Sequence, residues 1–458
     1  MKAFLTALVR GKPVDYLEIR LEESETTRVE FQGKRLENIG KSLSYGGNIR
    51  ALVGGGWGFV SFNSLEGLEE KVDLAIRQAR VAASLATEPV RLAQVPAVED
   101  VVRVRPVVSP REINLERKKD LLEGYARLIL NYSSEIVSAS IRYFDKFSRL
   151  HFANSEGSYI EQEKMDMGCN VAATAAANGQ SQSAHTGFGG SNDFSFIVGK
   201  EKEVEEVCHT AISLMRAEPI VGGQYPVILD PHLAGVFIHE AFGHLSESDG
   251  LHENENMRKV MTLGTRFGQE FLNVYDSGLD EGARGHLVYD DEGVRTQKTY
   301  LIKNGVLVGR LHSRETAGKM GEEPTGNARA ITYQFPPIVR MRNTCIEPGE
   351  ASFEDLLRGV NLGVYAKGAY GGQTNGEMFT FTAGEAYMIR NGQVAELVKD
   401  VTLTGNVFRT LKNIDLIGRD FTIFDSAGGC GKGGQMPLPV SHWAPHVRIQ
   451  NVVIGGKK

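Results

Sequence analysis

Residues 230–244 form the segment that most constrains how this chain can fold. Asp230-Pro231 is typical of a helix start, a capping carboxylate followed by proline at the first helical position. The sequence that follows is apolar nearly all round, which predicts a helix buried on every side. The same helix carries His239, Glu240 and His244, and burying such groups is costly unless they are paired or bound to a metal ion. The fold must therefore enclose this helix and satisfy these three side chains.

The spacing of the two histidines leaves two interpretations open. They lie five residues apart, whereas the histidines of the common His-Glu-x-x-His metal motif lie four apart on one helix face. On a straight helix of about 100° per residue they would point roughly 140° apart, too far to share an ion. A single π-turn or a break at Gly243 would bring them together, and π-turns tend to occur at functional sites. The alternative is two unrelated core histidines on a straight helix.

A metal centre with one open position needs a third protein ligand. Glu247 and Asp249 are candidates close in sequence. Cys430 is another, because it lies in the glycine-rich segment 428–435, where the backbone can wrap closely around a small object. Lys432 would help to hold the Cys430 thiol as a thiolate. The simpler interpretation of this segment is a flexible loop with an incidental thiol; it is not a phosphate loop, since glycine follows Lys432 where Ser or Thr is required.

His232 precedes His239 by seven residues and would share its face of the helix. The rise between them is about 10 Å, too large for both to bind one ion. His232 is therefore interpreted as a residue of the helix start and not as a ligand.

The length of 458 residues exceeds what one hydrophobic core usually supports, so more than one domain is expected. The expected fold class is α+β, with a mixed strand and helix region over 1–220, followed by a β-rich catalytic region over 221–458 that carries the metal-site helix. A connector interrupted by prolines over 88–112 could divide the first region further. Strands are expected at 16–20, 27–31, 49–53, 138–144 and 150–154, with turns at Gly33 and Gly46-Gly47, and helices at 64–85, 115–130 and 201–216. Asn304-Gly305 and Asn391-Gly392 predict β-hairpins.

Charge and composition argue against a nucleic-acid partner, against secretion and against a membrane span. The formal net charge is −6 without a dense Lys/Arg cluster, which predicts no nucleic-acid partner. The 4 cysteines lie far apart, as expected for reduced thiols in a cytoplasm. The apolar run near the N-terminus is brief and is followed by Arg10 and Lys12, so no signal peptide is expected. No apolar stretch approaches about 20 residues, so no membrane span is expected.

The paired motifs resemble those of the TldD/PmbA family, whose members are also described as modulators of DNA gyrase and as metallopeptidases. The resemblance covers nearly the whole chain. The matching segments are His239-Glu240-x-x-x-His244, Cys430-Gly-Lys-x-Gly-Gln435, Gly326-Asn327-Ala328-Arg329, and Glu18-Ile19-Arg20-Leu21-Glu22 with Trp57-Gly58-Phe59. It implies a metal ion bound by His239, His244 and Cys430, with Glu240 as the catalytic base. Because all four are present, the chain resembles the TldD-like branch that carries the metal motif.

The resemblance implies a metal-dependent peptidase that hydrolyses unfolded or small peptides, with one Zn²⁺ per active chain. It also implies a dimer, either a homodimer or a heterodimer with a PmbA-like paralogue. The alternative is a non-catalytic adaptor of the gyrase-modulator type, in which the metal is structural. No substrate-binding residue is assigned. His286, Tyr289 and Arg314 are candidate oxyanion donors, although a structural role is the simpler interpretation of each.

Overall fold

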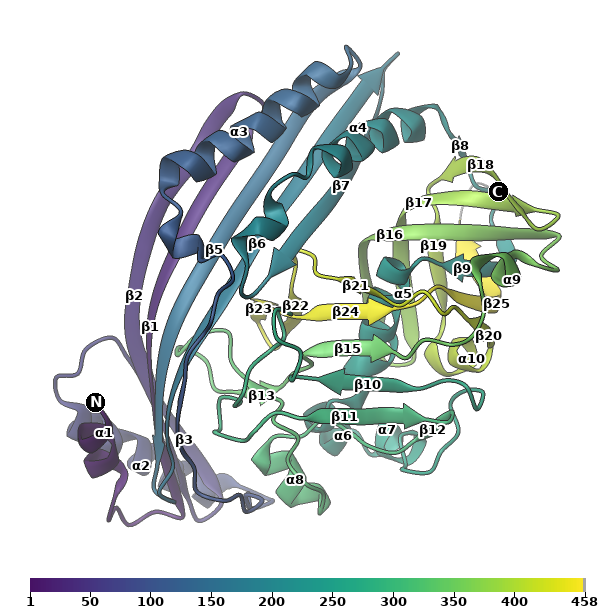
Figure 1. The fold of residues 1–458 in the computed structure, drawn as a ribbon. Coiled ribbons are helices and arrows are strands. Elements are labelled where there is room, and N and C mark those ends of the chain that lie inside the picture. Colours follow the sequence, from purple (N-terminus) through teal and green to yellow (C-terminus); the bar gives the residue numbers. More distant parts are fainter. Residues whose placement is uncertain (456–458) are drawn as a thin grey trace.

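The fold is α+β, as predicted, and combines one long sheet with a group of smaller ones (Figure 1). The computed structural model describes residues 1–455. The long, curved strands of residues 16–190 lie on one side of the molecule, and the sheets of residues 218–455 pack against them. Among the described residues, no helix has both the length and the apolar character needed to cross a membrane.

The long sheet has the strand order β3-β2-β1-β5-β6-β4, with β7 also paired to β6. Its pairings are antiparallel except that of β4 with β6. The strands are β1 (Tyr16–Gln32), β2 (Arg35–Val53), β3 (Gly56–Phe62), β4 (Glu99–Val102), β5 (Ile136–Asn154), β6 (Tyr159–Ala177) and β7 (Gln180–Gly190).

The expected turn at Gly46-Gly47 is wrong, because both glycines lie within β2. A Cβ atom at Gly46 would lie 2.3 Å from the ring of Tyr333, and one at Gly47 would lie 2.4 Å from the carbonyl oxygen of Arg20. These glycines therefore allow close packing of remote segments. The turn at Gly33 is confirmed between β1 and β2.

The two faces of the long sheet differ in what covers them. Successive residues of a strand point to opposite faces. Leu17, Ile19 and Leu21 pack in a core with residues of the helices α1 (Lys2–Val9) and α2 (Leu68–Leu85), and Val29 and Phe31 with residues of α3 (Leu115–Tyr132) and α4 (Glu201–Arg216). The residues that alternate with Leu17, Ile19 and Leu21 are the buried charged residues Glu18, Arg20 and Glu22, and on this side the sheet meets residues 218–455. The guanidinium of Arg20, for example, lies 3.5 Å from the carboxylate of Asp291.

Residues 218–455 form two main sheets around one helix. The larger has the order β16-β9-β25-β19-β17-β18-β8, with β20 on β25 and a further pairing of β16 with β17. Its strands are β8 (Glu218–Pro219), β9 (Gly223–Leu229), β16 (Leu362–Asn375), β17 (Met378–Arg390), β18 (Gln393–Lys399), β19 (Thr402–Asn406), β20 (Ile414–Ile417) and β25 (Val447–Gly455). The second sheet has the order β12-β11-β10-β15-β24-β21. Its strands are β10 (Val274–Ser277), β11 (Lys298–Lys303), β12 (Val306–Leu307), β15 (Asn343–Ile346), β21 (Thr422–Phe424) and β24 (Ser441–Ala444).

Smaller elements complete this part. Two short hairpins pair β13 (Ala328–Arg329) with β14 (Ile338–Val339), and β22 (Cys430–Lys432) with β23 (Gln435–Leu438). The short helices are α6 (Ser248–Glu253), α7 (Glu255–Val260), α8 (Arg314–Met320), α9 (Phe353–Leu357) and α10 (Val407–Lys412). Both Asn-Gly hairpins are confirmed, between β11 and β12 and between β17 and β18. Each of the four residues has a positive φ, as such turns require.

The helix α5 (Pro231–Ile238) lies between the two main sheets, which explains its apolar sequence (Figure 1). It follows β9 directly, and β9 is held between β16 and β25. Leu233, Phe237 and Ile238 are buried in the largest core cluster. The predicted cap is present, since the Oδ1 atom of Asp230 accepts hydrogen bonds from the backbone N–H groups of Leu233 at 2.8 Å and Gly368 at 3.1 Å.

The buried cap should make the stability of the fold depend on pH. Burial raises the pKa of Asp230 from 3.8 to about 6, although its two backbone hydrogen bonds oppose the shift. The folded protein thus binds this proton more tightly than the unfolded chain, so the resulting stability is complete below about pH 4 and is lost as the pH rises through 6. Asp230→Asn keeps a capping oxygen but has no titrating carboxyl, so this pH-dependent contribution to stability is absent in the variant. We expect the free energy of unfolding of wild type relative to Asp230→Asn to fall by about 1–3 kcal/mol from pH 4 to pH 7. Denaturant unfolding of chelator-treated protein would measure it, and parallel pH profiles would contradict it.

Candidate metal centre

The helix is distorted at the histidines, which agrees with the first of the two interpretations of the five-residue spacing. Residues His239–Gly243 form a π-turn that continues α5. The backbone N–H of His244 donates a hydrogen bond to the carbonyl of His239, five residues earlier. Gly243 packs closely here, because a Cβ atom at this position would lie 2.0 Å from the Sδ atom of Met341. The straight-helix interpretation is therefore wrong, and the two imidazoles face one another with ring centroids 5.2 Å apart.

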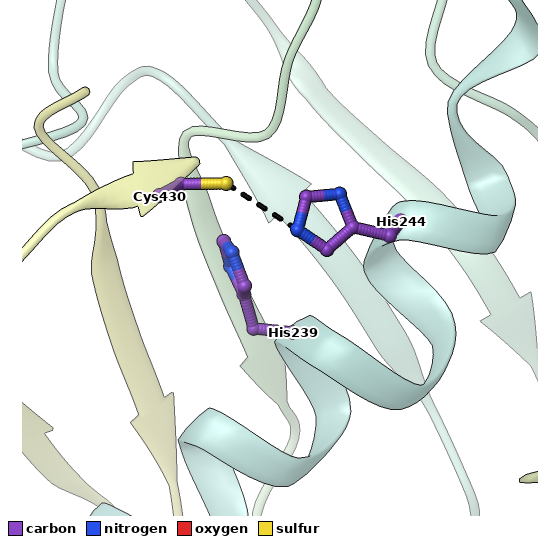
Figure 2. A group of neighbouring side chains, drawn as sticks. All are labelled: His239, His244 and Cys430. Carbon is purple, nitrogen blue, oxygen red and sulfur yellow. Dashed lines mark hydrogen bonds between the residues drawn. The ribbon is translucent and has the colours of Figure 1, made fainter. Parts of the chain in front are cut away.

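Cys430 lies opposite the two histidines, at the start of β22 (Figure 2). One ligand atom from each of His239, His244 and Cys430 lies within 4.8 Å of the others. The Nε2 atom of His244 is 3.4 Å from the Sγ atom of Cys430. The interpretation of Cys430 as part of an incidental flexible loop is therefore wrong, since its side chain is buried against the histidines.

His239 is held in an orientation that suits a metal ligand. Its Nδ1 atom lies 3.4 Å from the hydroxyl of Thr344 on β15, and that hydroxyl lies 3.2 Å from the carboxylate of Asp276 on β10. Because the hydroxyl donates its proton to Asp276, it accepts from Nδ1 and leaves the lone pair on Nε2. This Nε2 atom is buried and has no hydrogen-bond partner among the described residues. Burial, with His442 and His244 nearby, lowers the pKa of His239 well below its usual value, so the ring is neutral.

His244 is oriented by a buried acid on the same turn. The Nδ1 atom of His244 is 2.9 Å from the carboxylate of Glu247, which in turn lies 2.9 Å from the Nζ atom of Lys432. Burial alone would raise the pKa of Glu247, but Lys432 and His244 lower it. Burial disfavours the His244 cation, yet Glu247 and Cys430 more than offset this and raise its pKa to about 11. A metal ion would replace that proton, as ligand binding by imidazole requires.

These observations show that the residues fit a zinc ion. Two imidazoles, which bind metals in their neutral form, and a thiol are a set of ligands that Zn²⁺ prefers. One imidazole nitrogen is buried without a hydrogen-bond partner among the described residues, and both rings are oriented through their other nitrogen, as is common for metal-binding histidines.

Glu240 lies at the more open side of the group. Its carboxylate is 3.7 Å from the Nε2 atom of His244. The side chains of Glu240 and His244 are 23% and 21% exposed, whereas His239 and Cys430 are buried. Burial raises the pKa of Glu240, and the Glu247 carboxylate adds to the shift. Glu240 and His244 therefore form the more accessible side of the group, and His239 and Cys430 form its buried side.

The other residues singled out in the sequence have different places. Glu247 and Asp249 are not in the group of ligand atoms, since both carboxylates bind Lys432. The expected role of Lys432 is wrong, because its ammonium is directed to these carboxylates and to the carbonyl of Val339 and does not pair with the thiol. His232 lies outside the group, as expected.

The three candidate oxyanion donors make structural contacts. The Nδ1 atom of His286 is 2.8 Å from the carbonyl oxygen of Gly278. The hydroxyl of Tyr289 donates to Asp100, and the guanidinium of Arg314 donates to Glu156. The simpler interpretation of each residue is therefore supported.

Several residues that shape the centre were missed in the sequence. Asp276 and Thr344 orient His239, and the guanidinium of Arg340 donates to the carbonyl oxygen of Cys430 at 2.8 Å. Asn327, in a segment that was noted for another reason, donates to Asp276 at 2.9 Å. Its position in that segment is the one indication that the sequence contained.

Comparison with known proteins finds relatives over nearly the whole chain. Residues 17–79, 108–216 and 222–456 match the models for PmbA/TldA metallopeptidase domain 1, the central domain and the C-terminal domain. A metalloprotease of Synechocystis sp. is 45% identical over 444 residues, which cover 96% of this chain and 95% of that protein. A zinc metalloprotease TldD homolog of Saccharolobus solfataricus is 28% identical and covers 96% of each chain. The crystal structure of TldE from Thermococcus kodakarensis has the same fold, with a TM-score of 0.77 at 21% identity and 100% coverage of both chains.

The chain belongs to the PmbA/TldD metallopeptidase family, which confirms the resemblance noted in its motifs.

The contact between Glu247 and His244 should tune metal affinity. Replacing a carboxylate that orients a metal-binding histidine typically weakens metal binding 10–100-fold. We therefore expect Glu247→Gln to raise the zinc dissociation constant roughly 10–100-fold, as measured by competition with a chromophoric chelator. Glu255→Gln is the matched control, because Glu255 is exposed on α7 and pairs with Lys259. Equal affinity in wild type and Glu247→Gln would contradict the assignment.

Proposed function

We propose that this protein is a zinc-dependent peptidase that hydrolyses unfolded or small peptides. His239, His244 and Cys430 would bind one Zn²⁺ per chain, and Glu240 would act as the general base. The observation that carries the proposal is the π-turn, which turns both imidazoles toward Cys430. One ligand atom from each of the three side chains then lies within 4.8 Å of the other two. The names of the relatives, one of them a zinc metalloprotease, support the same activity.

The residues have complementary tasks in amide hydrolysis. A zinc ion bound there would polarise the scissile carbonyl and acidify water. The Glu240 carboxylate, at the opening beside His244, would accept a proton from the attacking water and deliver it to the leaving amine. Thr344 and Glu247 hold the two imidazoles in place while this happens. A thiolate ligand makes the ion less electrophilic than a carboxylate would, so we expect slow turnover.

The peptide substrate and the partners follow from the same proposal. Exposed sheet edges in residues 218–455 would pair with an extended peptide through main-chain hydrogen bonds, which favours unfolded chains. We also propose that the protein acts in the cytoplasm as a homodimer or as a heterodimer with a PmbA-like paralogue. The net charge of −6 supports function without nucleic acid.

Two substitutions separate the roles of metal and base. Glu240→Gln should keep one zinc per chain but lower the cleavage rate of an unstructured peptide by about 10²–10⁴-fold, because the proton acceptor is lost. Cys430→Ser should lose most of its zinc after dialysis. Cys208→Ser is the matched control, since Cys208 is a buried thiol on α4, in a core that contains none of the three proposed ligands. Metal analysis and a peptide-cleavage assay measure both effects.

Removal of the metal tests the proposal as a whole. Chelation should abolish cleavage, and added zinc should restore it. Undiminished cleavage after chelation would overturn the peptidase mechanism, and full zinc occupancy in Cys430→Ser would overturn the third ligand. Unchanged cleavage by Glu240→Gln would remove Glu240 from the mechanism. A zinc-loaded wild type that cleaves no peptide would favour the non-catalytic adaptor with a structural metal.

A further inference from the structure

The segment before Cys430 rests on a patch of the long sheet that has no side chains. Gly168 on β6 and Gly187 and Gly189 on β7, here named the glycine seat, share one face, since Gly168 is paired with Gly189. Ser426 and Ala427 lie on this seat. A Cβ atom at Gly168 would lie 2.6 Å from the Cβ of Ala427, and one at Gly189 would lie 2.5 Å from the carbonyl oxygen of Ser426.

The glycines of the seat leave space for Ser426 and Ala427, and they are not needed for an unusual backbone conformation. None of its residues has a positive φ, so the strands themselves would accept other side chains. At Gly187 a Cβ atom would lie 3.0 Å from the backbone nitrogen of Ala427. Any larger residue in the seat would therefore have to push the segment away from the sheet.

A buried arginine fastens the same segment. The guanidinium of Arg284 binds both carboxylate oxygens of Asp166 on β6, with Nε–Oδ1 and Nη2–Oδ2 distances of 2.6 and 2.8 Å. Its Nη1 atom donates to the carbonyl oxygens of Ser426, at 2.7 Å, and Gly428. These carbonyls flank Ala427, the residue in the glycine seat. A planar, bidentate pair fixes the direction of the guanidinium more strictly than a single contact would.

The fastened segment leads directly to the thiol. Only Gly429 separates Gly428 from Cys430, and a Cβ atom at Gly429 would lie 2.7 Å from the carbonyl oxygen of Leu438 on β23. Zinc sites tolerate errors in ligand distance of only about 0.2 Å. A shift of the segment on the sheet would therefore displace Sγ by more than the site could absorb.

We propose that the long N-terminal sheet helps to build the metal centre, with the glycine seat and the Arg284–Asp166 pair acting as positioning residues for Cys430. The inference rests on the proposed function in one respect, namely that Cys430 is a metal ligand. It goes further because it assigns a role in metal binding to residues outside the centre, namely Arg284 and residues of β6 and β7 on the long sheet.

The test compares metal binding by full-length variants of the seat and the pair. Zinc affinity is measured by chelator competition, and the thiolate-to-cobalt charge-transfer band of the Co²⁺-loaded protein reports the Cys430–metal bond. We expect Asp166→Asn and Gly168→Ala to bind zinc roughly 10–100-fold more weakly and to lose much of that band. Gly40→Ala, in open space on β2, is the control for a glycine substitution. Lys164→Gln, which breaks the pair with Asp291 from the same strand β6, is the control for a lost ion pair between the sheets.

A double-mutant cycle distinguishes positioning of Cys430 from a general effect on stability. If Asp166 acts through Cys430, adding Asp166→Asn to Cys430→Ser should cause no further loss of affinity. The inference would be overturned if Asp166→Asn weakened zinc binding as much in the Cys430→Ser background as it does in the wild-type background. It would also be overturned if both Asp166→Asn and Gly168→Ala kept a normal charge-transfer band and normal affinity. Failure of the underlying assignment would look different, since wild type itself would then lack the charge-transfer band.

Discussion

One backbone hydrogen bond, from the N–H of His244 to the carbonyl of His239, determines the geometry of the centre. With regular α-helical bonding the two imidazoles would diverge by roughly 140°, and no cysteine could complete the set. A π-turn is less favourable than a regular turn, so surrounding structure must enforce it. The surroundings of α5 are tightly packed, since a Cβ atom at Gly235 would lie 2.8 Å from the Cβ atom of His442 on β24, and one at Gly243 would lie 2.0 Å from the Sδ atom of Met341. The π-turn therefore lies where tertiary contacts can hold it.

Features that are set by residues close together in the sequence could be predicted. The cap at Asp230 and both Asn-Gly turns follow from local preferences, and the five-residue spacing of His239 and His244 indicated the π-turn as one of two alternatives. Gly46-Gly47 was misinterpreted because its reason is contact with Tyr333, almost 300 residues away. Asp276 and Thr344 could not be found for the same reason. They are ordinary strand residues until the sheet places β10 and β15 beside His239.

Lys432 shows how a correct pattern can suggest the wrong pairing. A cation two residues from a thiol suggests a stabilised thiolate, because alternate residues of a strand share a face. In the fold the side chain of Lys432 extends to Glu247 and Asp249. Its ammonium neutralises Glu247, the buried acid that orients His244. The hairpin of Cys430 is thus linked by Lys432 to the segment that follows the π-turn, and the residues just before the hairpin are linked to the long sheet by Arg284.

The position of β9 determines when, during synthesis, the segment that carries the histidines can fold. This strand leads into α5, and its neighbours β16 and β25 are formed by residues 362–375 and 447–455. A chain emerging from the ribosome folds its N-terminal portions first, but here the strand before the histidines stays without partners until residues far downstream have been made. Cys430 also emerges late. A nascent chain therefore cannot bring His239, His244 and Cys430 together until nearly all of its residues have been made.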